Sequence, residues 1–217
     1  MTTPSTTIAI PWFPGYTALD GIGPYEVLSR IPGHEVVFVG HERGVVRSDN
    51  GILGISIETT FEEVPSPEVV VFPGGPGTRA LVDDERVLDW LRKAHETTTY
   101  TTSVCTGSLL LAAAGLLEGL TATTHWVARD LLPMYGAIVS EDRVVEHLDQ
   151  RIITAAGVSS GIDMALRLVE LLADRTAAEA VQLMIEYDPQ PPFDAGALHK
   201  AGDHVLTRAG EYSAARR

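Results

Sequence analysis

The sequence contains a single cysteine among its 217 residues, so no disulfide bond can form within one chain. It has no run of about 18 uncharged apolar residues, which a membrane-spanning helix would need. Its first residues lack a basic start followed by a long apolar stretch, which argues against a secretory signal. These absences predict a cytoplasmic protein with no membrane segment.

Positive charge is also scarce. The 16 Lys and Arg residues are outnumbered by 29 Asp and Glu residues, for a formal net charge of −13. This charge repels phosphate backbones and anionic lipid surfaces, so we expect neither nucleic acid nor membrane as a partner. No histidines have a metal-ligand spacing, and the sequence has neither a P-loop nor a G-x-G-x-x-G fingerprint. We therefore expect no metal and no cofactor.

Apolar runs alternate with amphipathic stretches along the chain. Apolar runs predict strands at residues 7–13, 34–40 and 68–77, and β-forming residues predict a strand at 99–104. A hairpin is expected within 45–60 and two short strands within 143–157. The helical spacings lie at residues 24–28, 83–96, 106–117, 159–173 and 175–187. This alternation is typical of an α/β fold with a mostly parallel sheet and helices on both faces. We expect one domain over residues 1–217, in which 188–217 form a C-terminal extension that packs on the domain or on a partner subunit.

The lone cysteine, Cys105, follows a predicted strand and precedes a predicted helix. In an open α/β sheet such a turn lies at the carboxyl edge, where ligands bind. The helix N-terminus there is expected to lower the pKa of the thiol and favour the thiolate. A free cysteine is equally common as a small buried apolar residue, so its position alone leaves both interpretations open.

Three more strand-to-helix turns are expected at the same edge. Gly74 and Gly75 offer backbone N–H groups that can hold a developing negative charge, although Gly pairs are also common in plain turns. Asp20 is a candidate proton donor, because a desolvated carboxyl group beside a thiolate has a raised pKa. Taken alone, Asp20 is better explained as a helix N-cap. The turn at 157–161 is most simply explained by capping at Ser159.

One histidine, His125, lies in a stretch from which it could act on the thiol as a base. Because it stands beside Trp126, a structural hydrogen-bonding role is the better interpretation. The other histidines lie in polar stretches and are expected to be solvated.

Three strings resemble the PfpI-like superfamily of glutamine-amidotransferase-like folds: VVVFPGGPG, TSVCTGSLLLAAAGLLEGLTATTHW and GVSSGIDMALRLVELL. Within it, the strings LDGIGPYEVL, CTGS, TTHW and QLMIEYDPQPPFDAG resemble the isonitrile hydratase group. The resemblance covers roughly residues 8–197, nearly the whole chain. The resemblance implies a flavodoxin-like three-layer sandwich and a homodimer.

The resemblance also implies roles for particular residues. Cys105 would be the nucleophile and Asp20 its acid/base partner. Together they would add water to an organic isonitrile and give an N-substituted formamide through a cysteine-bound thioimidate. Backbone amides of Thr106 and Gly75 would orient the intermediate, and Val158 would line the pocket.

This chain departs from other branches of the superfamily at two of these positions. Most members have glutamate where Asp20 stands, and the protease-like members have histidine where Thr106 stands. Both departures argue against glyoxalase and peptidase chemistry. Two alternatives stay open: another cysteine-dependent activity of the superfamily (glyoxalase, deglycase or amidase), and a non-catalytic sensor of ligands or oxidants.

Overall fold

The computed structural model describes residues 6–215, which fall into two compact units. The first unit extends to Ile185, and the second begins at Glu186. The second unit contains a 3₁₀ turn, η4 (Leu198–Lys200), and a helix, α7 (Asp203–Ala215). It begins two residues before the predicted extension, whose packing on the domain or on a partner stays a prediction.

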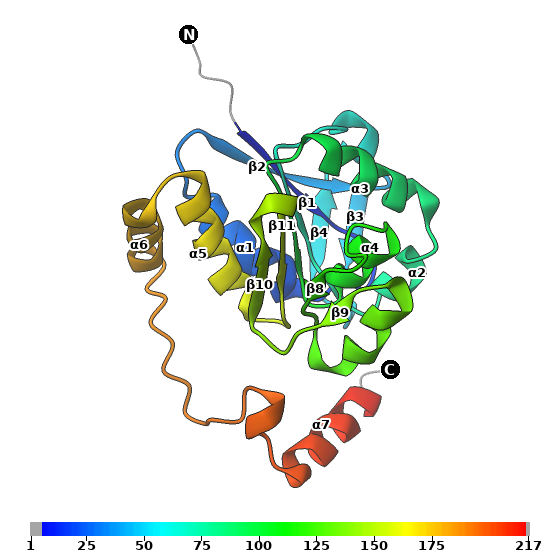
Figure 1. Cartoon of the computed structure of the whole chain (residues 1–217), viewed down its shortest axis with the longest axis vertical. Coiled ribbons are helices and arrows are strands. Elements are labelled where there is room, and N and C mark those ends of the chain that lie inside the picture. The colour runs from blue at the N-terminus through cyan, green and yellow to red at the C-terminus, as the bar shows by residue number, and fades with distance from the viewer. Residues whose placement is uncertain (1–5, 216–217) are drawn as a thin grey trace. The chain divides into compact units, whose positions relative to one another are not determined.

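A seven-stranded sheet forms the centre of the first unit, in the order β10-β11-β7-β6-β1-β2-β5 (Figure 1). Its strands are β1 (Thr6–Pro11), β2 (His34–Gly40), β5 (Thr59–Thr60), β6 (Val69–Phe72), β7 (Tyr100–Val104), β10 (Val144–His147) and β11 (Ile152–Ala155). Neighbouring strands run parallel except β10 and β11, which form an antiparallel hairpin at one edge. The predicted mostly parallel sheet is confirmed.

Helices cover both faces of this sheet. On one face α1 packs against α5, and on the other α3 packs against α4 (Figure 1). The helices of this unit are α1 (Ala18–Leu28), α2 (Thr78–Leu81), α3 (Glu85–Thr97), α4 (Gly107–Ala113), α5 (Ser160–Leu172) and α6 (Arg175–Met184). Because both faces are covered, every side chain of the central strand β6 is fully buried, which explains its continuous apolar sequence. The flavodoxin-like sandwich is confirmed.

The first unit also contains several smaller elements. The predicted hairpin is confirmed as the antiparallel pair β3 (Gly44–Arg47) and β4 (Gly54–Ile57). A short parallel pair, β8 (Thr121–Ala122) and β9 (Ile138–Val139), brackets the 3₁₀ segment η2 (Trp126–Tyr135). Two further 3₁₀ turns are η1 (Phe61–Glu63) and η3 (Leu148–Gln150).

The first helix is longer than its sequence pattern predicts. It begins at Ala18 rather than near Pro24, which lies inside the helix and cannot donate the backbone hydrogen bond of that turn. Tertiary packing sustains the helix, because Gly21 allows it to lie directly on the ring of Trp12. Thr17 is the N-cap and Asp20 lies in the first turn, so the interpretation of Asp20 as an N-cap is wrong.

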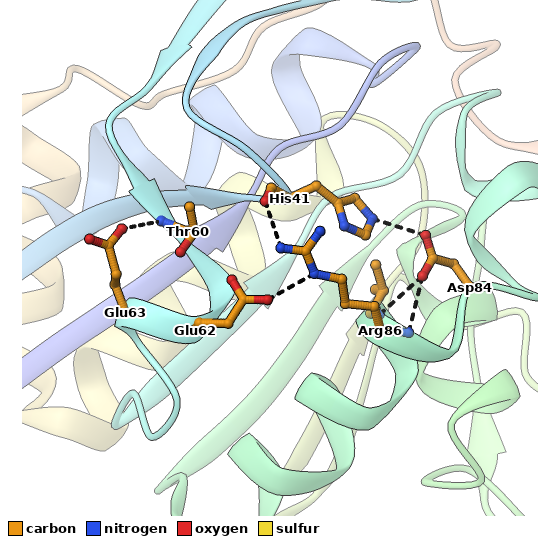
Figure 2. A network of polar contacts seen from close by, with 7 residues as sticks. His41, Thr60, Glu62, Glu63, Asp84 and Arg86 are labelled. Carbon is orange, nitrogen blue, oxygen red and sulfur yellow. Dashed lines mark hydrogen bonds and ion pairs between the residues drawn. The ribbon is translucent and has the colours of Figure 1, made fainter.

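A polar network joins the end of β2 to the start of α3 (Figure 2). The carboxylate of Asp84 caps α3 by accepting the N–H groups of Arg86 and Val87, and it lies 2.9 Å from Nε2 of His41. The guanidinium of Arg86 donates to the carboxylate of Glu62 and to the carbonyl of His41. The network fixes the helix start against the carboxyl edge of the sheet.

Replacing Asp84 by alanine is expected to lower the free energy of unfolding by about 1–2 kcal/mol, because the N-cap of α3 is lost. Urea denaturation followed by circular dichroism measures this change. Asp89 is a matched control on the same helix, since its side chain is mostly exposed and pairs only with Arg92. Asp89→Ala should change the free energy by less than about 1 kcal/mol. Equal effects of the two substitutions would contradict the capping role.

Candidate active site

Cys105 forms a sharp turn between β7 and α4. Its φ is +57°, in the left-handed region that residues other than glycine rarely adopt. Its N–H donates to the carbonyls of Ala155 and Ala156, and its carbonyl accepts from the hydroxyls of Thr124 and Ser108. These bonds hold a strained backbone in place at the carboxyl edge of the sheet, as the position after a strand predicts.

Asp20 lies fully buried beside this turn. Its Oδ2 accepts the N–H of Gly74 at 3.1 Å, and its carboxyl group interacts with the Cys105 thiol. Burial raises the pKa of Asp20 to about 7, although the neighbouring thiol and the N–H of Gly74 oppose the shift. The structure thus brings together the two side chains that the sequence predicts as partners, while their catalytic roles stay predictions.

The thiol of Cys105 is harder to ionise than the helix N-terminus predicts. Its side chain is nearly inaccessible, and this burial raises the pKa of the thiol well above its ordinary value. The charge of Asp20 raises this pKa further, whereas the backbone N–H and the hydroxyl of Thr106 lower it by less. The expectation of a lowered thiol pKa is therefore wrong. Near pH 7 the thiol keeps its proton while Asp20 is close to its midpoint.

The side chain of Thr106 holds the glycine turn that follows β6. Its Oγ1 accepts the N–H of Gly75 at 2.8 Å and donates to the carbonyl of Gly75 at 3.1 Å. The N–H of Gly74 is likewise engaged, by Asp20. The glycine amides are therefore not the free pair of donors that the sequence suggests. The two turns touch so closely that a Cβ on Gly74 would lie 2.5 Å from the backbone nitrogen of Thr106.

Val158 lies half-buried in the turn between β11 and α5. This turn adjoins the nucleophile, because Ala156 accepts the N–H of Cys105. A pocket-lining role for Val158 stays a prediction. Ser159 occupies the N-cap position of α5, but its side chain makes no capping bond and instead accepts from Arg143. The capping predicted for this turn is therefore wrong.

His125 is the N-cap of η2, and its Nδ1 accepts the N–H of Val127. Its ring lies against Gly157, in the turn that contains Val158. Burial lowers the pKa of this imidazole, and the nearby charge of Arg129 lowers it further. These contacts support the structural interpretation of His125 over the role of a base.

Sequence reasoning missed one residue of the site, Thr124. Its hydroxyl is buried and donates to the carbonyl of Cys105 at 2.9 Å. The TTHW string points to this segment of the chain as part of the site. It does not show which carbonyl the Thr124 hydroxyl meets, because that depends on how the chain after β8 lies beside the Cys105 turn.

The described part of the chain is residues 6–215. No group of three or more His, Cys, Asp or Glu side chains within that range is arranged to hold a metal ion. No helix within it is long and apolar enough to cross a membrane.

A doubly covered parallel sheet with a cysteine in a strained strand-to-helix turn and a buried acid beside it defines a class of cysteine-dependent α/β proteins. Residues 6–171 match the DJ-1/PfpI family, and the chain belongs to that family.

Three relatives place the chain within the family. It is 45% identical over 202 residues to the isonitrile hydratase of Pseudomonas putida, covering 93% of this chain and 87% of that one. The crystal structure of a ThiJ/PfpI family protein from Pseudomonas syringae matches with a TM-score of 0.91 at 41% identity, covering 98% of this chain and 88% of that one. The deglycase PfpI of Pyrococcus furiosus is 31% identical over 111 residues, 50% of this chain and 66% of that one. The predicted superfamily is confirmed.

Proposed function

We propose that this chain is an isonitrile hydratase, which adds water to an organic isonitrile and releases an N-substituted formamide. The observation that carries the proposal is the 45% identity to the Pseudomonas putida isonitrile hydratase along nearly the whole of both chains. The contact between Cys105 and Asp20 supports it, because the reaction needs a nucleophile for carbon and a group that moves protons.

The first step forms a covalent bond to sulfur. The Asp20 carboxylate takes the thiol proton as Sγ of Cys105 attacks the terminal carbon of the isonitrile. The carboxyl group then delivers this proton to the same carbon. The S–H bond breaks and its electron pair forms the S–C bond, the carbon lone pair forms the C–H bond, and one C–N π pair becomes the lone pair of the nitrogen. The product is a thioimidate, Cys–S–CH=N–R, and no atom leaves.

The second step consumes water. Asp20, again ionised, removes a proton from a water molecule while the oxygen of that water adds to the thioimidate carbon. The carboxyl group then passes this proton to the nitrogen. The tetrahedral intermediate then loses its hydroxyl proton and expels the sulfur, which recovers a proton. The sum is R–NC plus H₂O giving R–NH–CHO. The N–H of Thr106, which stabilises the ionised sulfur, assists its departure.

Gly75 and Val158 position the groups that react rather than reacting themselves. Gly75 orients the Thr106 hydroxyl through the two bonds between them. Val158 forms part of the wall that faces the R group of the substrate. We also propose that the enzyme works as a cytoplasmic homodimer without a cofactor. The resemblance to the family supports the dimer, and sedimentation equilibrium at micromolar concentration would test it.

The proposed activity is tested by mixing purified protein with cyclohexyl isonitrile and measuring N-cyclohexylformamide by mass spectrometry. Methylglyoxal in a parallel reaction tests the deglycase and glyoxalase alternatives. The similarity to the deglycase PfpI of Pyrococcus furiosus is the reason for testing them. Formamide production with little turnover of methylglyoxal is expected. Turnover of methylglyoxal with no formamide would contradict the proposal.

A further inference from the structure

The strained backbone of Cys105 has to be held from both sides. A residue with φ of +57° relaxes to a more favourable conformation unless its two peptide groups are fixed by their surroundings. The position of the sulfur follows that backbone, so whatever fixes the two peptide groups also sets where the nucleophile lies relative to Asp20 and Thr106.

The peptide group that follows Cys105 is held directly by Thr124. Its hydroxyl donates to the Cys105 carbonyl at 2.9 Å, and the side chain is fully buried. Ser108 donates to the same oxygen at 3.1 Å, but it belongs to α4, the helix that directly follows the Cys105 turn. Thr124 is therefore the hydroxyl that fixes this carbonyl from a separate segment of the chain.

The peptide group that precedes Cys105 is held through His125. The Cys105 N–H donates to the carbonyls of Ala155 and Ala156, at 3.0 and 3.2 Å. Gly157 comes next, and the ring of His125 lies so close to it that a Cβ built there would be 2.2 Å from Cδ2 of the ring. The ring thus blocks the turn from moving toward it, and the turn carries an acceptor for the N–H of Cys105.

We propose that Thr124 and His125 are positioning residues that together clamp both peptide groups of Cys105 in the conformation from which its sulfur attacks. Two adjacent residues after β8 would then control the reactivity of a thiol in another turn. The kinetic consequence rests on the proposed hydratase function, but alkylation of Cys105 by iodoacetamide tests the clamp without it.

The first test removes the Thr124 hydroxyl. Thr124→Val should slow alkylation of Cys105 at pH 8 about fivefold, the value of one lost hydrogen bond. It should lower kcat with little change in KM. Thr102→Val is the matched control, because Thr102 is a buried hydroxyl of β7 that donates to the Val70 carbonyl rather than to Cys105. It should lower the melting temperature to a similar extent and leave alkylation unchanged.

Thr124→Ser keeps the hydroxyl and should restore the alkylation rate even where Thr124→Val folds poorly. An unchanged or faster alkylation in Thr124→Val, or equal slowing in Thr102→Val, would overturn the role of Thr124. If Thr124→Val does not fold, slow alkylation in a folded Thr124→Ser would overturn it.

The second test uses the contact between His125 and Gly157. In Gly157→Ala the new methyl group collides with the ring, so the turn shifts and alkylation should slow about tenfold. His125→Ala removes the ring without adding a methyl group, and it should slow alkylation as well, because nothing then stops the turn from moving into the space of the ring. If a folded His125→Ala variant alkylates at the wild-type rate, the ring does not position the turn, and the role of His125 is overturned.

Discussion

Cys105→Ala is expected to abolish formamide production, lowering kcat by at least about 10³-fold. The methyl group cannot form the S–C bond, so the thioimidate is not made. The substitution should leave the fold intact, because Cys105 contributes one small buried side chain. Mass spectrometry of the formamide, with circular dichroism of the same sample, measures both consequences.

A serine at the same position tests whether another nucleophilic atom can replace the sulfur. Cys105→Ser keeps a nucleophilic atom at the same position in the side chain, but a hydroxyl gives up its proton far less readily than a thiol. This variant should therefore be almost as inactive as Cys105→Ala. Formamide production at the wild-type rate in the folded alanine variant would rule out covalent catalysis.

Asp20→Asn is expected to lower kcat by about 10²–10⁴-fold, the usual contribution of a positioned proton-transfer group. The amide cannot take the thiol proton or return it to carbon. In the wild type, activity should rise as pH rises through about 7, because the mechanism starts from the ionised form of Asp20. The pH profile of kcat/KM measures this, and an inflection near pH 7 that persists in Asp20→Asn would contradict the assignment.

The same substitution is expected to stabilise the protein. The pKa of Asp20 is about 7 in the fold and 3.8 for a free side chain, so between these values the folded chain binds more protons than the unfolded chain. Its contribution to stability therefore falls as pH rises through that window. Asp20→Asn removes this penalty and should raise the free energy of unfolding at pH 8, by no more than about 4 kcal/mol. Urea denaturation of both proteins at pH 4 and at pH 8 measures the difference in their free energies of unfolding. If that difference is the same at the two pH values, the raised pKa of Asp20 is contradicted.

The pairing of Cys105 with Asp20 was accessible from the sequence because both lie just beyond predicted strands. Parallel strands bring their carboxyl ends to one edge, so residues distant in the chain meet there. The first strand, the apolar run of β6 and the β-forming residues of β7 were clear enough to place these turns. The register of the individual side chains was not needed for that inference.

The ionisation of the thiol was not accessible in the same way. The helix N-terminus at Thr106 does lower the pKa of Cys105, as its position indicates. Burial and the charge of Asp20 oppose it and prevail, and both depend on how α1 packs beside the turn. Because α1 starts six residues before Pro24, the local sequence pattern also misplaced its first turn. Tertiary packing decided both outcomes.

Which groups accept the N–H groups of the two glycines likewise depends on residues distant in the sequence. The sequence shows that Gly74 and Gly75 follow a strand, but not that Asp20 and Thr106 already accept their N–H groups. The donor at Thr124 was missed for the same reason, since its acceptor is a carbonyl 19 residues away.

The coupling of the Cys105 thiol to the Asp20 carboxyl group is tested most directly by the pH dependence of Cys105 alkylation in the wild type and in Asp20→Asn. Peptide mass spectrometry gives the alkylation rate at each pH. The thiol should ionise at lower pH in Asp20→Asn, because the neighbouring negative charge is gone. The same titration midpoint in both proteins would show that the two groups do not interact, and the proposed proton exchange between them would be wrong.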